Sequence, residues 1–216
     1  MSSRWWLPVL DRPDGVAPKR PLQSHRRYEI VVIGCSLGGM NVLETILSGL
    51  PAEFAVPIAI VQHRHRASSE TLPAHFRRYS KLPVVDAVDK QWIRDGTIYF
   101  APANYHLLVS RGEFSLSVDA AVRYSRPSID VLFESAADAY GAATIGVVLT
   151  GANDDGCRGA TAIKKRGGVI VVQHPETAEA REMPDSVVRS VRVDRILRPE
   201  EIAPFLAERC QLASRP

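Results

Sequence analysis

The sequence predicts an α/β fold: a three-layer, doubly wound domain with a mainly parallel sheet and one antiparallel hairpin excursion. Three observations predict it. Short apolar runs alternate with amphipathic segments from Tyr28 onward, which is typical of βα units. Several of these runs are apolar without alternation, as strands covered on both faces are. The 216 residues also suffice to bury a substantial core in one domain.

Eight apolar runs are the predicted strands. In chain order they are YEIVVIG (28–34), VPIAIVQ (56–62), LPVVDAV (82–88), TIYFA (97–101), HLLV (106–109), FSLSV (114–118), TIGVVLT (144–150) and GGVIVVQ (167–173). Helical patterns lie between them, at about 39–50, 68–79, 128–140, 157–166 and 200–210. The stretch from about 92 to 118 is typical of hairpin strands, so the antiparallel excursion is expected there.

Residues 1–27 are predicted to form a flexible basic arm, and residues 28–216 a single folded domain. The arm contains four prolines and lacks a sustained period of 2 or 3.6. It carries a net charge of +4, whereas the whole chain carries +3, which leaves −1 for the remaining residues. The basic pI therefore reflects the arm, and we expect no nucleic-acid binding by the folded part. Trp5 and Trp6 could dock on a partner or on the domain, or belong to a plain disordered tail.

The composition favours a cytoplasmic protein without membrane insertion. No apolar stretch approaches the roughly 20 residues of a membrane helix, and the WWLPVL run near the N-terminus is too short for a signal peptide. Cys35, Cys157 and Cys210 form no CxxC pair. We expect them to be packed free thiols in a reducing compartment.

The first motif that could carry chemistry is VVIGCSLGG, residues 31–39. An apolar strand runs directly into a glycine-rich turn, and an amphipathic helix follows. The Gly34-x-Ser36-x-Gly38 spacing matches a nucleophile elbow, in which a tight turn presents a serine hydroxyl at the edge of the sheet. Two other interpretations stay open on this motif alone. Ser36 could be only a helix N-cap, or the glycines could belong to a phosphate-binding loop, although the G-x-G-x-x-G spacing and the Walker lysine are missing.

The second motif is VQHRHR, residues 61–66, at the end of the next predicted strand. In a parallel sheet the carboxyl ends of the strands line the edge where ligands bind. His63 is therefore expected on the same edge as Ser36. His65 is the alternative histidine, and Arg64 and Arg66 could bind an acidic partner.

The third motif is LTGANDDGCRGA, residues 149–160, which is again a strand, a glycine-rich turn and a helix. One of its carboxylates, Asp154 or Asp155, could hold the imidazolium of His63 and fix its tautomer. A metal site and a simple helix cap by Asp155 are the alternatives. The spacing fits neither an EF-hand nor a zinc site, so we expect neither a metal nor a cofactor.

Together these segments resemble the protein-glutamate methylesterases of bacterial chemotaxis (CheB-type), from about Tyr28 to about Leu206. The shared motifs are IGCSLGG (33–39), VQH (61–63), YFAPANYHL (99–107), SRPSIDVLFES (125–135), GVVLTGANDDGCRGA (146–160) and EMPDSVV (182–188). The resemblance implies hydrolysis of glutamate γ-methyl esters on the cytoplasmic helices of chemoreceptors, with release of methanol and related deamidation of glutamine.

Carried over position by position, the resemblance implies that Ser36 is the nucleophile, His63 the base and Asp155 the orienting acid. It implies acyl transfer through a glutamyl-enzyme, which water then hydrolyses. The backbone N–H groups of Leu37 and Ala152 are the candidates for the oxyanion hole.

Two positions of the acid loop depart from the family's usual T-G-M-G-x-D-G, and its variable position is occupied by an aspartate. Ala152 replaces a methionine, but a backbone donor survives that change. Asn153 replaces a glycine, and asparagine accepts left-handed backbone better than most residues. Asp154 adds a second carboxylate. If both aspartates face inward, one of them should have a raised pKa, which could lower activity at neutral pH.

The arm also stands where family members commonly carry a phosphorylatable receiver domain. We therefore expect constitutive activity or control by a separate regulator or receiver protein.

Three rival functions remain. One is an esterase with the chain order Ser36, Asp155, His174. The second is a catalytically weak or inactive module that docks on signalling partners. The third, nucleotide binding, lacks a ribose-binding acid.

Overall fold

The computed structural model describes residues 28–63 and 72–211. The predicted arm, residues 1–27, lies outside the described residues, and so do Arg64, His65 and Arg66.

Nine strands form two sheets in the described part of the chain. They are β1 (Ile30–Cys35), β2 (Ile58–Gln62), β3 (Val84–Asp86), β4 (Ile98–Phe100), β5 (His106–Ser110), β6 (Glu113–Ser117), β7 (Thr144–Val148), β8 (Val169–Gln173) and β9 (Arg195–Leu197). Seven of them make one sheet in the order β3-β4-β2-β1-β7-β8-β9, in which every described pair is parallel. The other two, β5 and β6, form an antiparallel hairpin.

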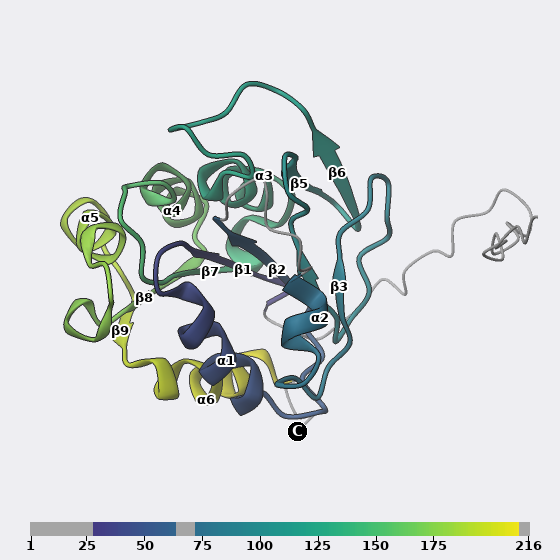
Figure 1. The fold of residues 1–216 in the computed structure, drawn as a ribbon, viewed down its shortest axis with the longest axis horizontal. Helices are drawn as coiled ribbons and strands as arrows, with labels where there is room; N and C mark the ends of the chain where they lie inside the picture. The colour runs from purple at the N-terminus through teal and green to yellow at the C-terminus, as the bar shows by residue number, and fades with distance from the viewer. Residues whose placement is uncertain (1–27, 64–71, 212–216) are drawn as a thin grey trace, which may run out of the picture.

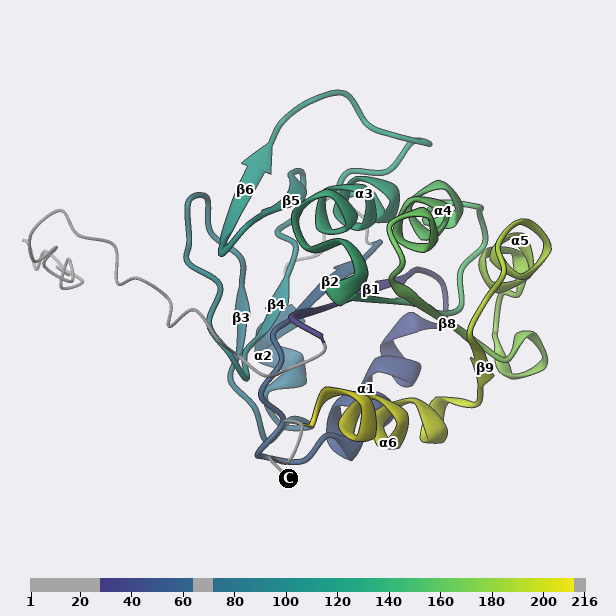
Figure 2. The ribbon, with the colours of Figure 1, turned by 180° about the vertical axis from the view of Figure 1, so that it is seen from behind.

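Helices cover both faces of the large sheet (Figures 1 and 2). The α-helices are α1 (Gly39–Gly49), α2 (Leu72–Phe76), α3 (Ile129–Tyr140), α4 (Cys157–Lys165), α5 (Glu182–Ser190) and α6 (Pro199–Cys210). One layer contains α1, α2 and α6, and the opposite layer contains α3, α4 and α5 together with the β5–β6 hairpin. No helix among the described residues is both long and apolar enough to cross a membrane.

Two apolar cores lie on the two faces of the sheet, because alternate residues of each strand point to opposite sides. Val31 and Ile33 of β1 pack on the α1 side, and Ile30 and Val32 pack on the α3 side. The whole of β1 is buried. This two-sided burial is the physical reason why its sequence is apolar without alternation.

The predicted fold class is confirmed: a parallel sheet between two helical layers, with an antiparallel hairpin. The prediction was wrong in detail for β4, which was placed in the hairpin region but pairs in parallel with β2 and β3. Three residues are too few to show whether a strand is parallel. The prediction also missed α5, which contains an internal proline, and β9, which is short and largely exposed.

The order of the strands reverses between β1 and β7. The chain moves outward from β1 through β2 in one direction, and from β7 through β8 in the other. In open α/β sheets, ligands bind outside the carboxyl ends of the strands at such a switch point. The topology therefore marks the edge that follows Cys35 and Val148 as the place to look for a site.

Candidate active site

Ser36 lies in the turn between β1 and α1. The turn is tight because Gly38, which caps α1, adopts a left-handed φ of 77° that a residue with a side chain would rarely adopt. Ser36 is half-buried. The backbone N–H groups of Leu37 and Ala152 donate to no acceptor among the described residues. The turn thus presents a serine hydroxyl beside unused donors at the start of an 11-residue helix.

The strand ladders bring His63 beside Ser36. The last paired residues of β1 and β2 are Cys35 and Gln62, so Ser36 and His63 each lie one residue beyond the same register position. The His63 N–H donates to the Cys35 carbonyl over 3.0 Å, and the Ser36 N–H donates to the Thr150 carbonyl over 2.9 Å. The serine is therefore held between the ends of β2 and β7.

Gly151 completes the contact between the Ser36 turn and the acid loop. A Cβ at this position would lie 3.0 Å from the Cβ of Ser36 and would collide with the Cε of Met183. Met183 is fully buried and lies in the first turn of α5. The main chain of Gly151 is consequently wedged between Ser36 and Met183, and only a glycine fits there without displacement.

His63 Nε2 lies 2.8 Å from Asp155 Oδ2. The His63 side chain is 11% exposed and that of Asp155 is fully buried. A carboxylate only accepts hydrogen bonds, so Nε2 carries the proton in this contact. Nδ1 is then the ring nitrogen that has a lone pair to offer.

The Asp155 carboxylate sits at the N-terminus of α3. Oδ1 accepts from the Ser128 hydroxyl and the Asp130 N–H, both over 2.9 Å, and Oδ2 accepts from the Ile129 N–H over 2.7 Å as well as from His63. Burial by itself would raise the pKa of Asp155. The bonds from His63 and from the N–H groups of Asp130 and Ile129 outweigh it, and the pKa lies below its usual value. Asp155 is thus an ionised acceptor at the start of a helix.

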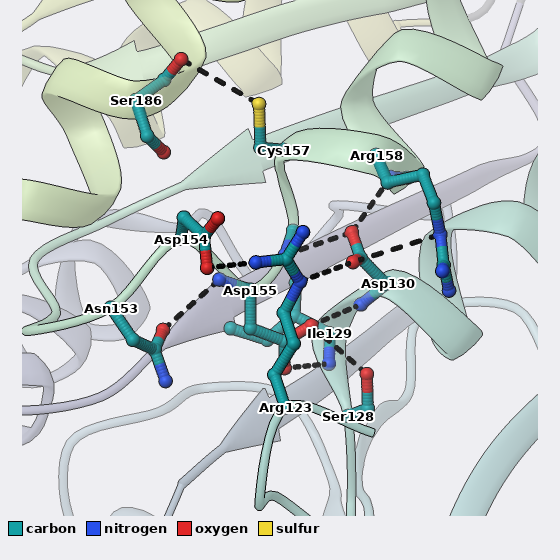
Figure 3. Close-up of polar contacts among 12 residues, drawn as sticks. Arg123, Ser128, Ile129, Asp130, Asn153, Asp154, Asp155, Cys157, Arg158 and Ser186 are labelled. Carbon is teal, nitrogen blue, oxygen red and sulfur yellow. Dashed lines mark hydrogen bonds and ion pairs between the residues drawn. The ribbon is translucent and has the colours of Figure 1, made fainter.

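Asp130 makes the reciprocal contact with α4 (Figure 3). Its Oδ1 accepts from the Gly156 N–H over 2.9 Å and from the Gly159 N–H over 2.8 Å, at the start of α4. Each of the two helices is therefore capped by an aspartate that belongs to the N-terminus of the other. Asp130 Oδ2 receives no hydrogen bond from the described residues, although the Nε atoms of Arg123 and Arg158 lie 3.6 and 3.8 Å away. Burial raises the pKa of Asp130, and the neighbouring charge of Asp155 adds to the rise.

Comparisons with known proteins identify the family of the chain. The family model described as CheB methylesterase matches residues 31–206. The chain belongs to the CheB methylesterase family.

Two relatives and one solved structure illustrate the match. A Leptospira interrogans protein, provisionally named a protein-glutamate methylesterase/protein-glutamine glutaminase, is 46% identical over 82% of this chain and 92% of its own length. A Trichodesmium erythraeum protein with the same activity in its name is 36% identical over 85% of this chain but only 53% of its own length. The crystal structure of the Thermotoga maritima CheB methylesterase catalytic domain superimposes with a TM-score of 0.80 at 34% identity, covering 84% of this chain and 98% of that domain. The chain thus spans nearly all of the first relative and about half of the second.

The unusual acid loop of this methylesterase-family chain turns Asp154 away from the buried pair. Asp154 is exposed and forms an ion pair with Arg123. The second carboxylate that shares the interior with Asp155 is Asp130, not Asp154. The sequence raised the possibility of two buried carboxylates side by side. The partner of Asp155 in such a pair is Asp130, a residue of the SRPSIDVLFES motif.

Asn153 also behaves differently from the prediction. Its φ is not among the positive values found at non-glycine residues of the described chain, so left-handed backbone is not the reason why it replaces a glycine. Its side-chain oxygen instead accepts from the Asp155 N–H over 3.1 Å. The side chain thereby helps to fix the turn that presents Asp155.

Four site residues were missed as individual residues, although the family motifs contained them. Ser128 and Asp130 fix Asp155 as described above. His106 is buried; its Nδ1 accepts from the Ser128 N–H over 3.2 Å and its Nε2 donates to the Ala120 carbonyl over 3.1 Å. Gln62 is the fourth, and its amide contacts the main chain of Ser36. The signal in the sequence was a polar residue at the end of an apolar segment, since Gln62 ends β2, His106 begins β5, and Ser128 and Asp130 lie at the start of α3.

The structure does not bring the rival histidine to the acid. His174 follows β8, which is separated from β1 by β7. Its Nδ1 accepts from the Glu176 N–H over 3.3 Å, where it caps a short 3₁₀ turn. Among the described residues, no group of three or more histidine, cysteine, aspartate or glutamate side chains is arranged to hold a metal ion.

Proposed function

We propose that this chain is a serine esterase that hydrolyses glutamate γ-methyl esters on the cytoplasmic helices of chemoreceptors, with a Ser36–His63–Asp155 triad. One observation carries the proposal. The buried Asp155 carboxylate holds the ring of His63 at 2.8 Å, one residue past the strand register that also positions Ser36. The relatives whose names include protein-glutamate methylesterase and protein-glutamine glutaminase supply the substrate class, and deamidation of glutamine is the related reaction.

The first half of the reaction is acylation of the serine. His63 Nδ1 takes the proton of the Ser36 hydroxyl as the oxygen attacks the ester carbonyl. The imidazolium that forms is stabilised by Asp155, whose lowered pKa keeps it ionised. His63 then gives the proton to the departing methoxide, which leaves as methanol.

The second half is hydrolysis of the glutamyl-enzyme. His63 takes a proton from water, the hydroxide attacks the acyl carbon, and the proton returns to Ser36 Oγ. The product is a glutamate side chain. The same sequence acting on a glutamine amide would release ammonia in place of methanol.

The oxyanion of both tetrahedral intermediates is assigned to the backbone N–H groups of Leu37 and Ala152. Both donors are unused among the described residues, and the first stands at the positive end of α1. Because the donors are backbone groups, the replacement of the family's methionine by Ala152 leaves them intact.

We place the reaction in the cytoplasm, where the methylated receptor helices are the macromolecular partner. The proposal also includes a separate regulator or receiver protein that controls the activity. The Trichodesmium erythraeum relative is about twice as long as the matched region, so the catalytic domain accompanies further sequence there.

The test is methanol release from methylated chemoreceptor membranes by the intact chain and by Ser36→Ala, His63→Ala and Asp155→Asn. The intact chain should release methanol, and each variant should lower kcat by about 10³-fold or more. Labelling of Ser36 by a serine-directed fluorophosphonate gives a second readout that needs no receptor. Labelling without methanol release would point to a different ester. If the intact chain is not labelled and releases no methanol, the result would favour the rival function, a catalytically inactive module that docks on signalling partners.

A further inference from the structure

Gln62 connects the nucleophile and the base through their main chains. It is the last residue of β2, and only 6% of its surface is exposed. Its Nε2 donates to the Ser36 carbonyl over 2.9 Å and to the His63 carbonyl over 2.7 Å. A primary amide has two N–H groups, so this side chain uses both of its donors on the two residues.

The orientation of the amide is fixed from its other end. Oε1 accepts from the Cys35 thiol over 3.0 Å. Burial raises the pKa of Cys35, which keeps the sulfur protonated and able to donate. A Cβ on residue 39 would collide with Gln62 Oε1, so Gly39 leaves the space that the amide occupies. An amide turned the other way would place its oxygen against two carbonyl oxygens and lose both bonds to them.

The location of the amide gives these bonds a purpose. The β1–β2 register ends at Cys35 and Gln62, and the His63 N–H donates one further bond, to the Cys35 carbonyl. Beyond that point, the carbonyls of Ser36 and His63 are joined by the Gln62 side chain. The Gln62 side chain therefore links the two segments just beyond the last backbone hydrogen bond of the β1–β2 pair. At this place, the separation of the two main chains sets the separation of the Ser36 and His63 side chains. Displacements of about 1 Å at such a place cost about 100-fold in rate.

We infer that Gln62 is a positioning residue for the reaction: its buried amide sets the distance between the main chains of Ser36 and His63. The inference rests on the proposed function and assigns Gln62 no contact with the substrate. In the same arrangement, Cys35 orients the amide and Gly39 makes room for it. This accounts for two further residues of the IGCSLGG motif.

The first test compares Gln62→Met and Gln62→Glu with the intact chain. The methionine has a similar length and no donors, and the glutamate is isosteric but presents oxygen to both carbonyls. Both variants should lower kcat for methanol release and the rate of fluorophosphonate labelling of Ser36 by about 100-fold. KM should stay within about threefold, because the receptor surface is untouched.

Thr144→Val is the matched control for lost stability. Thr144 is fully buried at the opposite end of β7 and donates to the Ala136 carbonyl over 3.2 Å. The variant should lower the melting temperature while keeping kcat within about twofold, since its hydrogen bond lies away from the site.

A milder pair of variants remains informative if the Gln62 substitutions fail to fold. Cys35→Ala removes the donor that orients the amide, and Cys35→Ser restores an O–H donor. The serine variant should keep a labelling rate at least about threefold higher than the alanine variant, at equal or lower melting temperature.

The outcomes separate the inference from the function on which it rests. Folded Gln62 variants with the labelling rate and kcat of an active intact chain would overturn the inference alone. Losses of activity no larger than that of Thr144→Val, at equal loss of stability, would overturn it in the same way. An intact chain that neither labels at Ser36 nor releases methanol would remove the proposed function and the inference together.

Discussion

The Asp155 carboxylate has two roles at the level of the single residue. It accepts the ring proton of His63 and also the first N–H groups of α3. The sequence alone did not distinguish it from its neighbour Asp154, because adjacent residues in a turn give no sign of which side chain faces inward. The family resemblance selected Asp155. The structure adds a physical distinction, since one carboxylate is buried among four donors and the other is exposed and paired with Arg123.

Removal of the Asp154 charge should have little effect. Asp154→Asn loses an ion pair between two partly exposed side chains. Such pairs contribute about 0–1 kcal/mol, so the free energy of unfolding should fall by no more than that, and kcat should stay within about twofold. Urea denaturation and methanol release measure the two quantities. A large rise in kcat would show instead that the additional carboxylate suppresses activity.

Gly151→Ala should disturb the site from the side of the acid loop. The added methyl group would collide with Met183 and press against the Cβ of Ser36. Overpacking of this kind costs about 1–3 kcal/mol, and we expect a loss of both stability and kcat, measured by urea denaturation and methanol release.

A double variant separates the two contacts. Met183→Ala makes room on one side only, so Gly151→Ala/Met183→Ala should show a favourable coupling of about 1 kcal/mol in stability. Its kcat should stay low, because Ser36 remains displaced. Recovery of both quantities would assign the whole effect to Met183.

At the level of the element, the helices α3 and α4 cap each other. Asp155 precedes α4 and binds the N-terminus of α3, while Asp130 lies in the first turn of α3 and binds the start of α4. The sequence predicted both helices closely from their apolar periodicity. It gave no sign of the exchange, because a capping aspartate is normally sought within a few residues of its own helix. These caps come from about 25 residues away along the chain.

Asp130→Ala should therefore destabilise two elements. It leaves the N–H groups of Gly156 and Gly159 buried without their acceptor, and unsatisfied buried groups cost about 1–3 kcal/mol each. We expect a loss of about 2–4 kcal/mol in urea denaturation and faster amide exchange at the start of α4. Asp138→Ala is the control on the same helix, since Asp138 forms an exposed pair with Arg166. Equal losses in the two variants would contradict the capping role.

At the level of the whole molecule, the parallel sheet places the site. Apolar strands without alternation were enough to predict covered parallel strands, and their carboxyl ends were enough to put Ser36, His63 and the acid at one edge. The order β2-β1-β7 and the common register of Ser36 and His63 could not be predicted from the sequence, because the residue pattern of a strand does not indicate which strand pairs with it. Gln62 and His106 were missed for the same reason, since their partners lie on other segments.

The two buried aspartates should oppose each other in the pH dependence of stability. The pKa of Asp155 is lowered in the folded protein, so its contribution is present above the ordinary value of about 3.9 and is lost as the pH falls toward the folded value. The pKa of Asp130 is raised, so above about pH 3.9 the folded state keeps a proton that the unfolded state has lost. The stability that this proton contributes is lost as the pH rises through the raised pKa.

Urea denaturation between about pH 2.5 and pH 7 tests this opposition. Asp155→Asn should flatten the loss of stability in acid. Asp130→Asn should remove the decline expected above about pH 3.9. Each variant will also lose stability by an amount that does not vary with pH, because a helix cap is weakened, so only the shapes of the curves are compared. Parallel curves for all three proteins would contradict the assignment.

Under the proposed function, the capping role of Asp155 decides which variant of low activity suits a capture reagent for the receptor. Asp155→Asn removes a charge from the start of α3, so its loss of turnover mixes chemistry with a weakened helix. Ser36→Ala deletes the hydroxyl oxygen of a half-buried residue and leaves both aspartate caps in place. An immobilised Ser36→Ala protein should therefore bind methylated receptor fragments with the affinity of the intact chain. It should not convert them to product and release them.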